Sequence, residues 1–394
     1  MLQLPIYLDN HATTRVDPRV VDAMLPYFTQ VYGNAGSTSH SFGWEARAAA
    51  DDARGRIAAA INASEREIVF TSGATESNNL AIRGVAERAR RRGNHIVSVT
   101  TEHKAVLDPL KKLARKGFEV TLLPVRQVGD PKGTGLIEIA QLTAALRDDT
   151  CLVSVMLANN EIGVIQPIAQ IGELCRERGI PFHCDATQAV GKIPVDVAKL
   201  NVDLLSFTAH KLYGPKGIGA LYVRRGSRLE GQIDGGGQEN NLRSGTLPVP
   251  LVVGFAAALD LCLAEMQGEE SLRLHHLRAR LYSQLEAALP DLVLNGPGLG
   301  DSRLPGNLNV AFPLVQGEAL MMSMRDIAVS SGSACTSANP EPSHVLRAIG
   351  QTEDLILASL RFGIGRFNTE EEIDFAAASV IENVRRLRQL SSLA

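Results

Sequence analysis

Short runs of apolar residues alternate with longer stretches of helical spacing through the first two-thirds of the chain. Most of the short runs are rich in β-branched residues and flanked by Gly, Asn or Asp, which is typical of strands. They are continuously apolar, so we expect both faces to be covered, as in a mainly parallel sheet. The predicted strands are residues 68–71, 96–99, 120–123, 152–157, 181–184, 204–207 and 220–223.

The stretches between these runs have the spacing of helices with one buried face. A repeated strand–helix–strand order predicts a doubly wound α/β structure with right-handed crossovers. The predicted helices are residues 44–61, 76–92, 105–116 and 167–178.

The pattern changes after about residue 254, where strands become fewer and helices longer. This change predicts a second, smaller α+β domain in the last third of the chain. The elements expected there are helices over 255–266, 271–289 and 369–389, and strands over 308–312, 328–331 and 360–364.

Composition and charge limit the kinds of partner that the protein is expected to bind. Of the 394 residues, 45% are hydrophobic and 21% are charged, which are ordinary globular proportions. Forty Lys plus Arg stand against 43 Asp plus Glu, giving a net charge of −3. We therefore expect no nucleic-acid partner and no membrane surface, because both favour a basic excess. No run of about 18 uninterrupted apolar residues predicts a membrane span.

The cysteines give no sign of a disulfide framework. There are five, an odd number, at positions 151, 175, 184, 262 and 335, and none forms a Cys-x-x-Cys pair. This spacing indicates neither a zinc knuckle nor any other metal site, and it suits a reducing compartment, so we expect a cytoplasmic protein. Residues 1–10 lack the basic and apolar regions of a signal peptide.

Residues 71–79 (TSGATESNN) run from a predicted strand through a turn of small residues into a predicted helix. The free N–H groups and the dipole of a helix start can bind a phosphate there. A plain helix cap by Ser72 or Thr75 is the simpler alternative. Neither a Walker A sequence nor a Gly-x-Gly-x-x-Gly turn is present, so a nucleotide is not the expected phosphate ligand.

Two further groups follow predicted strands. Asp185 comes after a buried strand, where a carboxylate faces the ligand crevice of an α/β sheet and could hold a protonated ring nitrogen. Capping the next helix is its alternative task. His103 follows the strand at 96–99 and could stack on a flat ring and carry protons, although a lone histidine is more often structural.

The loop after the strand at 204–207 contains Lys211 and Lys216. Partial burial lowers the pKa of a lysine and helps it to form an imine. A loop lysine with its stem on apolar surface is the simpler interpretation, and position alone does not choose between the two lysines.

Two residues near the C-terminus complete the candidates. Cys335 lies in a small, polar segment, where a cysteine is poor packing material but a good nucleophile. The other four cysteines lie in apolar or helical contexts and are expected to be structural. Arg361 lies in an apolar strand, where a cation needs a partner. A substrate carboxylate or an internal acidic residue would serve equally well.

Together, a phosphate turn, a carboxylate, a stacking histidine and an imine-forming lysine describe a site for pyridoxal 5'-phosphate (PLP). The chain resembles the cysteine desulfurases, which belong to the class V aminotransferase group of fold-type-I PLP enzymes. The resemblance is to their NifS/IscS branch. It is carried, in order along the chain, by residues 7–14 (YLDNHATT), 71–79, 159–163 (NNEIG), 185–188 (DATQ), 210–217 (HKLYGPKG), 243–246 (RSGT) and 330–337 (SSGSACTS).

The resemblance implies a fold-type-I PLP-dependent transferase fold. Residues 15–262 would form the large PLP-binding domain, and residues 1–14 with 263–394 the small domain that carries the cysteine. It also implies that Lys211, rather than Lys216, forms the Schiff base with PLP.

The remaining roles that the resemblance implies fall into cofactor and substrate contacts. His103 would stack on the ring and Asp185 would pair with its nitrogen. Cys335 would accept the sulfur. Ala74, Thr75, Thr208 and His210 would bind the phosphate, Asn160 and Gln188 the ring hydroxyl region, Thr246 the phosphate of the partner subunit in an obligate homodimer, and Asn34 and Arg361 the substrate carboxylate.

The reaction implied is the conversion of L-cysteine to L-alanine with a persulfide left on Cys335. Lys211 would take the α-proton, and His103 would manage protons at the sulfur. The sulfur would pass to an acceptor such as an iron–sulfur scaffold, for cluster assembly or other thio-cofactors. A selenocysteine lyase or an aminotransferase on the same fold is the enzymatic alternative, and a non-catalytic sulfur carrier is the alternative from another class.

Two positions depart from the family pattern. Ala35 stands where the family often has Pro after Asn34, and Gly363 stands where it commonly has Ser. The glycine leaves the hydrogen bonding near Arg361 open at this stage. Neither departure removes a chemical group that the reaction needs.

Overall fold

The central sheet contains all seven strands that the sequence predicts. The computed structural model describes residues 2–89, 93–331 and 342–391. The strand order is β2-β8-β7-β6-β5-β3-β4, and pairing is parallel except that β8 is antiparallel to both neighbours. The strands are β2 (Ile68–Thr71), β3 (His95–Val99), β4 (Glu119–Leu123), β5 (Thr150–Ser154), β6 (Phe182–Asp185), β7 (Leu204–Thr208) and β8 (Gly219–Val223).

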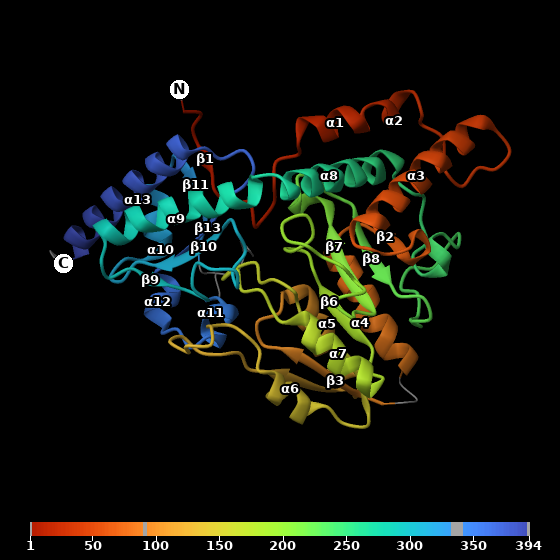
Figure 1. Ribbon diagram of the computed structural model, residues 1–394, viewed down its shortest axis with the longest axis horizontal. Helices are drawn as coiled ribbons and strands as arrows, with labels where there is room; N and C mark the ends of the chain where they lie inside the picture. Colours follow the sequence, from red (N-terminus) through yellow and green to blue (C-terminus); the bar gives the residue numbers. More distant parts are fainter. Residues whose placement is uncertain (1, 90–92, 332–341, 392–394) are drawn as a thin grey trace.

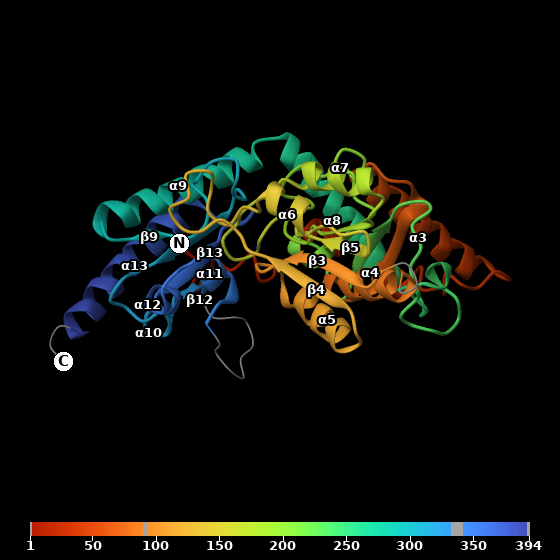
Figure 2. The same cartoon turned by 90° about the horizontal axis from the view of Figure 1, so that it is seen from below.

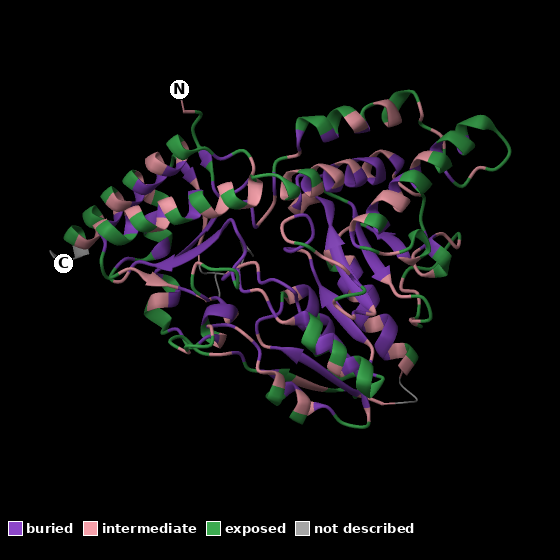
Figure 3. Ribbon diagram, in the orientation of Figure 1, coloured by how far each residue is buried: buried purple, intermediate pink, exposed green. Residues whose placement is uncertain are grey.

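Helices cover both faces of this sheet, which confirms the doubly wound prediction (Figure 1). Successive apolar residues of a strand face opposite layers. Val69 thus packs with α4 (Ala74–Ala89) and α5 (Lys104–Arg115), whereas Phe70 packs with the layer of α3 (Ser41–Ala60), α7 (Ile168–Arg178) and α8 (Val249–Gln267). Except for the edge strand β4, the strands are buried along most of their length (Figure 3). Continuous apolar runs therefore reflect burial on two sides.

A second sheet, with the order β12-β13-β10-β9, is antiparallel and lies beside the first (Figures 1 and 2). Its core includes Leu281 of α9 and Val380 of α13, together with strand residues such as Phe362. The elements are α9 (Glu270–Ala288), β9 (Val293–Leu294), β10 (Asn307–Ala311), β12 (Ser330–Ser331), β13 (Ser359–Gly363) and α13 (Glu370–Ser391).

The N-terminal segment joins this second part of the molecule. β1 (Ile6–Tyr7) pairs in parallel with β11 (Ile327–Ala328). The strand predicted over 328–331 is therefore two short strands, β11 and β12, which pair with different partners. The proposed domain boundary at 262 falls inside α8, which continues to Gln267, so the two-domain division stays a proposal.

The remaining helices are short and connect these layers. They are α1 (Pro18–Met24), α2 (Pro26–Thr29), α6 (Ile139–Ala145), α10 (Gly317–Ser323), α11 (His344–Ala348) and α12 (Glu353–Leu357). Among the described residues, one helix, α8, is long and apolar enough to cross a membrane, but 50% of that stretch is buried inside the protein. Helix α8 packs against α3 in the core, and this burial explains why its residues are so apolar.

Candidate active site

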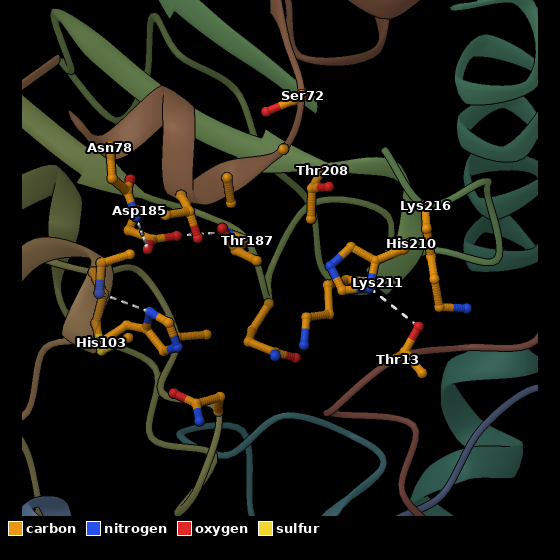
Figure 4. Close-up of a pocket in the computed structure, with 18 of the residues that line it drawn as sticks. Thr13, Ser72, Asn78, His103, Asp185, Thr187, Thr208, His210, Lys211 and Lys216 are labelled. Carbon is orange, nitrogen blue, oxygen red and sulfur yellow. Dashed lines mark hydrogen bonds between the residues drawn. The ribbon is translucent and has the colours of Figure 1, made fainter. Parts of the chain in front are cut away.

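A pocket of about 470 Å³ opens where β6 and β7 end and α4 begins (Figure 4). The carboxyl ends of parallel strands meet at one edge of a sheet, which is where α/β proteins bind ligands. Nine of the predicted site residues line this pocket: Ala74, Thr75, His103, Asn160, Asp185, Gln188, Thr208, His210 and Lys211. The structure brings them together, and their individual roles stay predictions.

The start of α4 forms one wall of the pocket. The chain leaves β2 at Thr71 and turns through Gly73, whose φ of +154° favours glycine. The Ser72 N–H donates to the Glu76 carboxylate at 2.7 Å, so the helix supplies its own cap. The N–H groups of the first turn have no partners within the helix, and they can bind an anion in the pocket.

Asp185 lies at the end of β6 with both carboxylate oxygens engaged. Oδ2 accepts from Asn78 Nδ2 at 2.7 Å, and Oδ1 accepts from the Thr187 N–H at 2.9 Å. The second bond is the local capping contact that the sequence offered as the alternative. Asp185 is buried, and both of these donors are neutral groups. A buried carboxylate held by neutral donors suits a protonated ring nitrogen.

His103 is the N-cap of α5, and its ring Nδ1 accepts from the Ala105 N–H at 3.0 Å. That bond leaves the proton of the neutral ring on Nε2. Desolvation by the surrounding protein lowers the pKa of His103, and the charge of Lys211 lowers it further, while Asp185 opposes both. His103 is therefore neutral at pH 7.

Lys211 ends the short helix η2 (Ala209–Lys211) that follows β7. Its Nζ donates to the carbonyl oxygens of His11 at 2.6 Å and Ala12 at 2.5 Å. Lys216 also lines the pocket but is exposed, whereas Lys211 is partly buried. In Figure 4, Lys211 lies between Lys216 and the side of the pocket that holds Asp185 and His103. The geometry therefore favours Lys211 over Lys216, which position in the sequence alone left open.

Gln188, Thr208 and His210 are each held by a contact with another segment of the chain. Gln188 Nε2 donates to the His11 carbonyl at 2.9 Å, and Thr208 Oγ1 donates to the Ile218 carbonyl at 2.9 Å. His210 Nδ1 lies 3.1 Å from Thr13 Oγ1. Burial, with the charges of nearby lysines, lowers the pKa of His210 to about 4, so it is a neutral hydrogen-bonding group.

Arg361 lies behind the pocket. Its Nη1 donates to the Asn160 carbonyl at 3.1 Å, and its Nη2 donates to Asp9 Oδ1 at 2.8 Å and to Ser330 Oγ at 2.9 Å. The sequence allowed an internal acidic residue as the partner of Arg361, and Asp9 is such a partner. The buried Nε of Arg361 has no partner among the described residues. Its contact with substrate stays a prediction.

Two predicted residues lie elsewhere, and the place of a third is not described. Asn34 and Thr246 do not line this pocket; both line a second hollow of about 450 Å³ beside α3. Cys335 lies outside the residues that the structure describes. Within the described residues, no group of three or more His, Cys, Asp or Glu side chains could hold a metal ion.

Steric crowding explains why glycine occupies position 363. A Cβ built on Gly363 would lie 2.8 Å from the backbone nitrogens of Asn10 and His11 and 3.1 Å from His11 Cδ2. The Asn10 N–H also donates to the Gly363 carbonyl at 3.1 Å. Glycine thus allows close approach of the segment whose His11 carbonyl binds Lys211.

The donor set of the pocket fits PLP. Lys211 and Lys216 line the pocket together with Ala74 and Thr75 at the start of α4, so the pocket can neutralise a phosphate. Asp185 is the carboxylate suited to a ring nitrogen, and His103 offers a flat ring beside it. A primary amine, an anion site and a buried carboxylate in one cavity match the aldehyde, phosphate and pyridine of this cofactor.

Sequence reasoning assigned no role to four residues near the pocket. Thr13 and Asn78 line it, and both lie inside quoted motifs, which could have drawn attention to them. Glu102 is fully buried, and burial followed by repulsion from Asp185 raises its pKa well above the usual range. Lys192 contacts Gln188 and carried no motif in the sequence.

Comparison with known proteins agrees with this geometry. A family model described as Aminotransferase class-V matches residues 6–375. The cysteine desulfurase IscS of Anaeromyxobacter dehalogenans (strain 2CP-C) is 56% identical over 100% of this chain and 95% of its own length. The cysteine desulfurase of Mus musculus is 53% identical over 99% of this chain and 83% of its own.

Two solved structures have the same fold. One, described as a NifS-like protein, has a TM-score of 0.89 at 36% identity and covers 97% of this chain and 100% of its own. The other, described as SspA in complex with cysteine, has a TM-score of 0.79 at 36% identity, over 92% of this chain and 100% of its own.

The fold, the lysine pocket and the match over residues 6–375 place the chain in the class-V aminotransferase family, whose fold class was predicted from the sequence. Within that family it belongs to the cysteine desulfurases, which are PLP-dependent enzymes. The resemblance stated from the motifs is thereby confirmed.

Proposed function

We propose that this desulfurase takes sulfur from L-cysteine, with PLP held at Lys211, and leaves L-alanine and a persulfide on Cys335. The observation that carries the proposal is that Lys211, Asp185 and the start of α4 line one pocket. The close cysteine desulfurase relatives, and the neighbour whose structure is described with cysteine, support the choice of substrate.

When bound, PLP supplies an electron sink that weakens bonds at the α-carbon of an amino acid. The residues here would hold its parts separately. Lys211 would bind the aldehyde, Asp185 would hold the ring nitrogen in its protonated form, and Ala74, Thr75, Thr208 and His210 would surround the phosphate. Asn160 and Gln188 line the same pocket and would bind the ring hydroxyl region.

The proton chemistry falls to two side chains. Lys211 Nζ donates to the carbonyl oxygens of His11 and Ala12, which hold its amine at the pocket. It becomes a base when it leaves them, and it can then take the α-proton of the substrate. His103 carries its proton on Nε2, so it can donate at the substrate while Nδ1 keeps its bond to Ala105.

Sulfur transfer balances without an added oxidant. The Cys335 thiolate would attack the substrate sulfur, forming a sulfur–sulfur bond while the bond from that sulfur to the β-carbon breaks. The electron pair returns to the carbon skeleton, which is protonated and leaves as alanine. Cysteine and one enzyme thiol thus give alanine and one enzyme persulfide. An acceptor thiol, such as that of an iron–sulfur scaffold protein, would then take the terminal sulfur.

Two observations support a homodimer. Asn34 and Thr246 line a hollow of their own, where they would be available to the pocket of a second copy. Large apolar side chains are also exposed on the adjoining helices and loop: Leu25, Phe28, Tyr32, Phe42 and Trp44. Exposed apolar surface of this kind is typical of protein interfaces.

We place the enzyme in the cytoplasm. The four cysteines among the described residues are buried and form no disulfide with one another. Thiols that stay reduced are typical of that compartment.

The test uses reduction with borohydride, followed by peptide mapping. The purified protein, loaded with PLP, should carry the reduced cofactor on Lys211, and it should form alanine from L-cysteine. Lys211→Ala should lose both properties, whereas Lys216→Ala should keep the modification. Modification of Lys216 in place of Lys211, or keto acid as the main product of cysteine, would contradict the proposal.

A further inference from the structure

The amide of Gln188 makes three polar contacts with two residues that the reaction does not use, Lys192 and His11. Its Oε1 accepts from Lys192 Nζ at 2.8 Å and lies 3.1 Å from His11 Nδ1. Its Nε2 donates to the His11 carbonyl at 2.9 Å. Gln188 is buried and lines the proposed cofactor pocket. Lys192 and His11 therefore hold the amide from the side opposite the pocket.

The fold forces Lys192 into this position. Gly191 has a φ of +77°, and a Cβ there would lie 3.1 Å from Leu212 Cβ and 3.2 Å from Cys262 Cβ. The turn is thus pressed between the loop of Lys211 and helix α8. Lys192 follows this turn and lines, together with His11, a small cavity of about 30 Å³, which is large enough for a water molecule.

The chemistry of its two partners decides which way the amide points. The ammonium form of Lys192 can only donate, so it requires the oxygen of Gln188, and the His11 carbonyl can only accept, so it requires Nε2. With Oε1 facing Lys192, Nε2 must lie on the other branch of the amide. One of its two hydrogens is given to His11, and the second is left for the pocket.

We propose that Lys192 is a positioning residue that fixes Gln188 as a hydrogen-bond donor toward the cofactor pocket. The inference rests on the proposed function, because the acceptor it serves is the anionic ring oxygen of PLP. The same contact ties Gln188 to His11, whose carbonyl binds Lys211. One small polar cluster therefore orients both the cofactor lysine and the residue predicted to bind the ring hydroxyl region.

The charges around Lys192 permit this arrangement. Burial of its amine lowers the pKa of Lys192 to about 7, and the charges of Lys211 and Arg361 act in the same direction. Burial also lowers the pKa of His11 well below its ordinary range, so its neutral ring can donate from Nδ1. The groups that face Lys192 are Lys211 in the loop after β7, His11 after β1, Cys262 in α8 and Arg361 in β13, while Glu270 in α9 and Tyr213 line the same small cavity.

The test compares the visible absorbance of the PLP-loaded enzyme as a function of pH. Lys192→Met removes the donor, and Lys192→Gln keeps a donor without the charge. Lys199→Met is the matched control, because the Lys199 side chain is 85% exposed and nearby in the sequence. We expect Lys192→Met to raise the pH at the midpoint of the absorbance change by on the order of one unit. The reason is that the substitution weakens the hydrogen bond from Gln188 that stabilises the deprotonated form of the bound cofactor. Lys192→Gln and Lys199→Met should stay near the unsubstituted enzyme.

A double variant separates positioning from direct charge. In a Gln188→Ala background, Lys192→Met should cause no further shift, because its effect acts through Gln188. Equal shifts for Lys192→Met and Lys192→Gln, the same shift in both backgrounds, or no shift would overturn the inference. An unsubstituted enzyme without a pH-dependent visible band would instead contradict the proposed function itself, and the inference with it.

Thermal unfolding of the cofactor-free protein provides a readout that does not depend on PLP. A lysine whose pKa falls to about 7 on folding destabilises the protein at low pH, where it must stay charged in a buried place. Lys192→Met should therefore raise the unfolding temperature below pH 7, and the gain should shrink as the pH rises toward the ordinary lysine pKa. A gain that is independent of pH would contradict the buried position of the amine.

Discussion

The Nζ of Lys211 lies 2.6 Å from the carbonyl oxygen of His11, although the two residues are far apart in the sequence. The pairing of β1 with β11 and the contact of Asn10 with Gly363 hold the N-terminal segment in place. The pocket lysine is therefore oriented by a segment anchored on the second sheet. Movement of that segment would displace the carbonyl oxygens that accept hydrogen bonds from Lys211.

Gly363→Ala tests this dependence. A Cβ at this position would lie 2.8 Å from two backbone nitrogens, so the segment of residues 10–11 must shift. We expect a loss of roughly 1–3 kcal/mol in the free energy of unfolding and weaker PLP binding. Chemical denaturation and a cofactor titration measure the two effects.

Gly55→Ala is the matched control for that change. Gly55 lies inside α3, and a Cβ there meets nothing within 4 Å. It should stabilise the protein by roughly 0.5–1 kcal/mol, because glycine is a poor helix former. Equal behaviour of the two variants would mean that the close approach at Gly363 does not matter.

The pH dependence of the reaction should reflect His103. Its pKa is lowered, chiefly by desolvation, so the neutral form persists at pH 7 and is lost only below the ordinary histidine range. If the neutral ring is the active form, kcat/KM should fall as the pH falls through that lowered pKa. Steady-state rates across pH measure the acid limb of the profile.

His103→Gln should move or remove that limb and lower the rate by roughly 10²–10⁴-fold, the usual contribution of a positioned proton donor. His276→Gln is a suitable control, because that side chain is exposed and pairs with Glu370 at the surface. An acid limb unchanged in His103→Gln would assign the ionisation to another group.

Arg361 has two candidate partners, and a pair of variants separates them. Arg361→Lys keeps a charge for Asp9 but loses the paired donors that suit a carboxylate. If Arg361 also holds the substrate, KM for L-cysteine should rise roughly tenfold or more, equivalent to ~1.4 kcal/mol of binding. Steady-state kinetics gives KM and kcat separately.

Asp9→Asn removes the internal partner instead. It should lower the stability of the protein, because it leaves a buried cation without its carboxylate. It should not raise KM for L-cysteine. A loss of stability in both variants with no change in KM would leave Arg361 with a structural task alone.

Local pattern predicted the sheet and much of the pocket. Strands buried on two sides are continuous apolar runs. Asp185 ends one of these strands, and Lys211 ends the short helix η2 that follows another. The carboxyl ends of parallel strands lie at one edge of the sheet, so side chains placed there come close together. The motif at 71–79 likewise predicted the start of α4, although the helix begins at Ala74, two residues before the predicted position.

Contacts between distant segments were beyond reach of the pattern. Asp9 and Arg361 meet because β12 and β13 pair beside the N-terminal segment, and Lys192 meets Gln188 because the turn at Gly191 packs under the Lys211 loop. Nothing in the residues around Lys192 indicates that this lysine is buried. For Arg361, the sequence allowed an internal or a substrate carboxylate, and the internal one is present.

The most direct test of the whole account is mass spectrometry of the Cys335 peptide after the PLP-loaded enzyme has reacted with L-cysteine. The account predicts that this peptide gains the mass of one sulfur atom while L-alanine forms, and that Lys211→Ala shows neither change. Alanine formed while Cys335 stays unmodified, or full activity in Cys335→Ala, would contradict it.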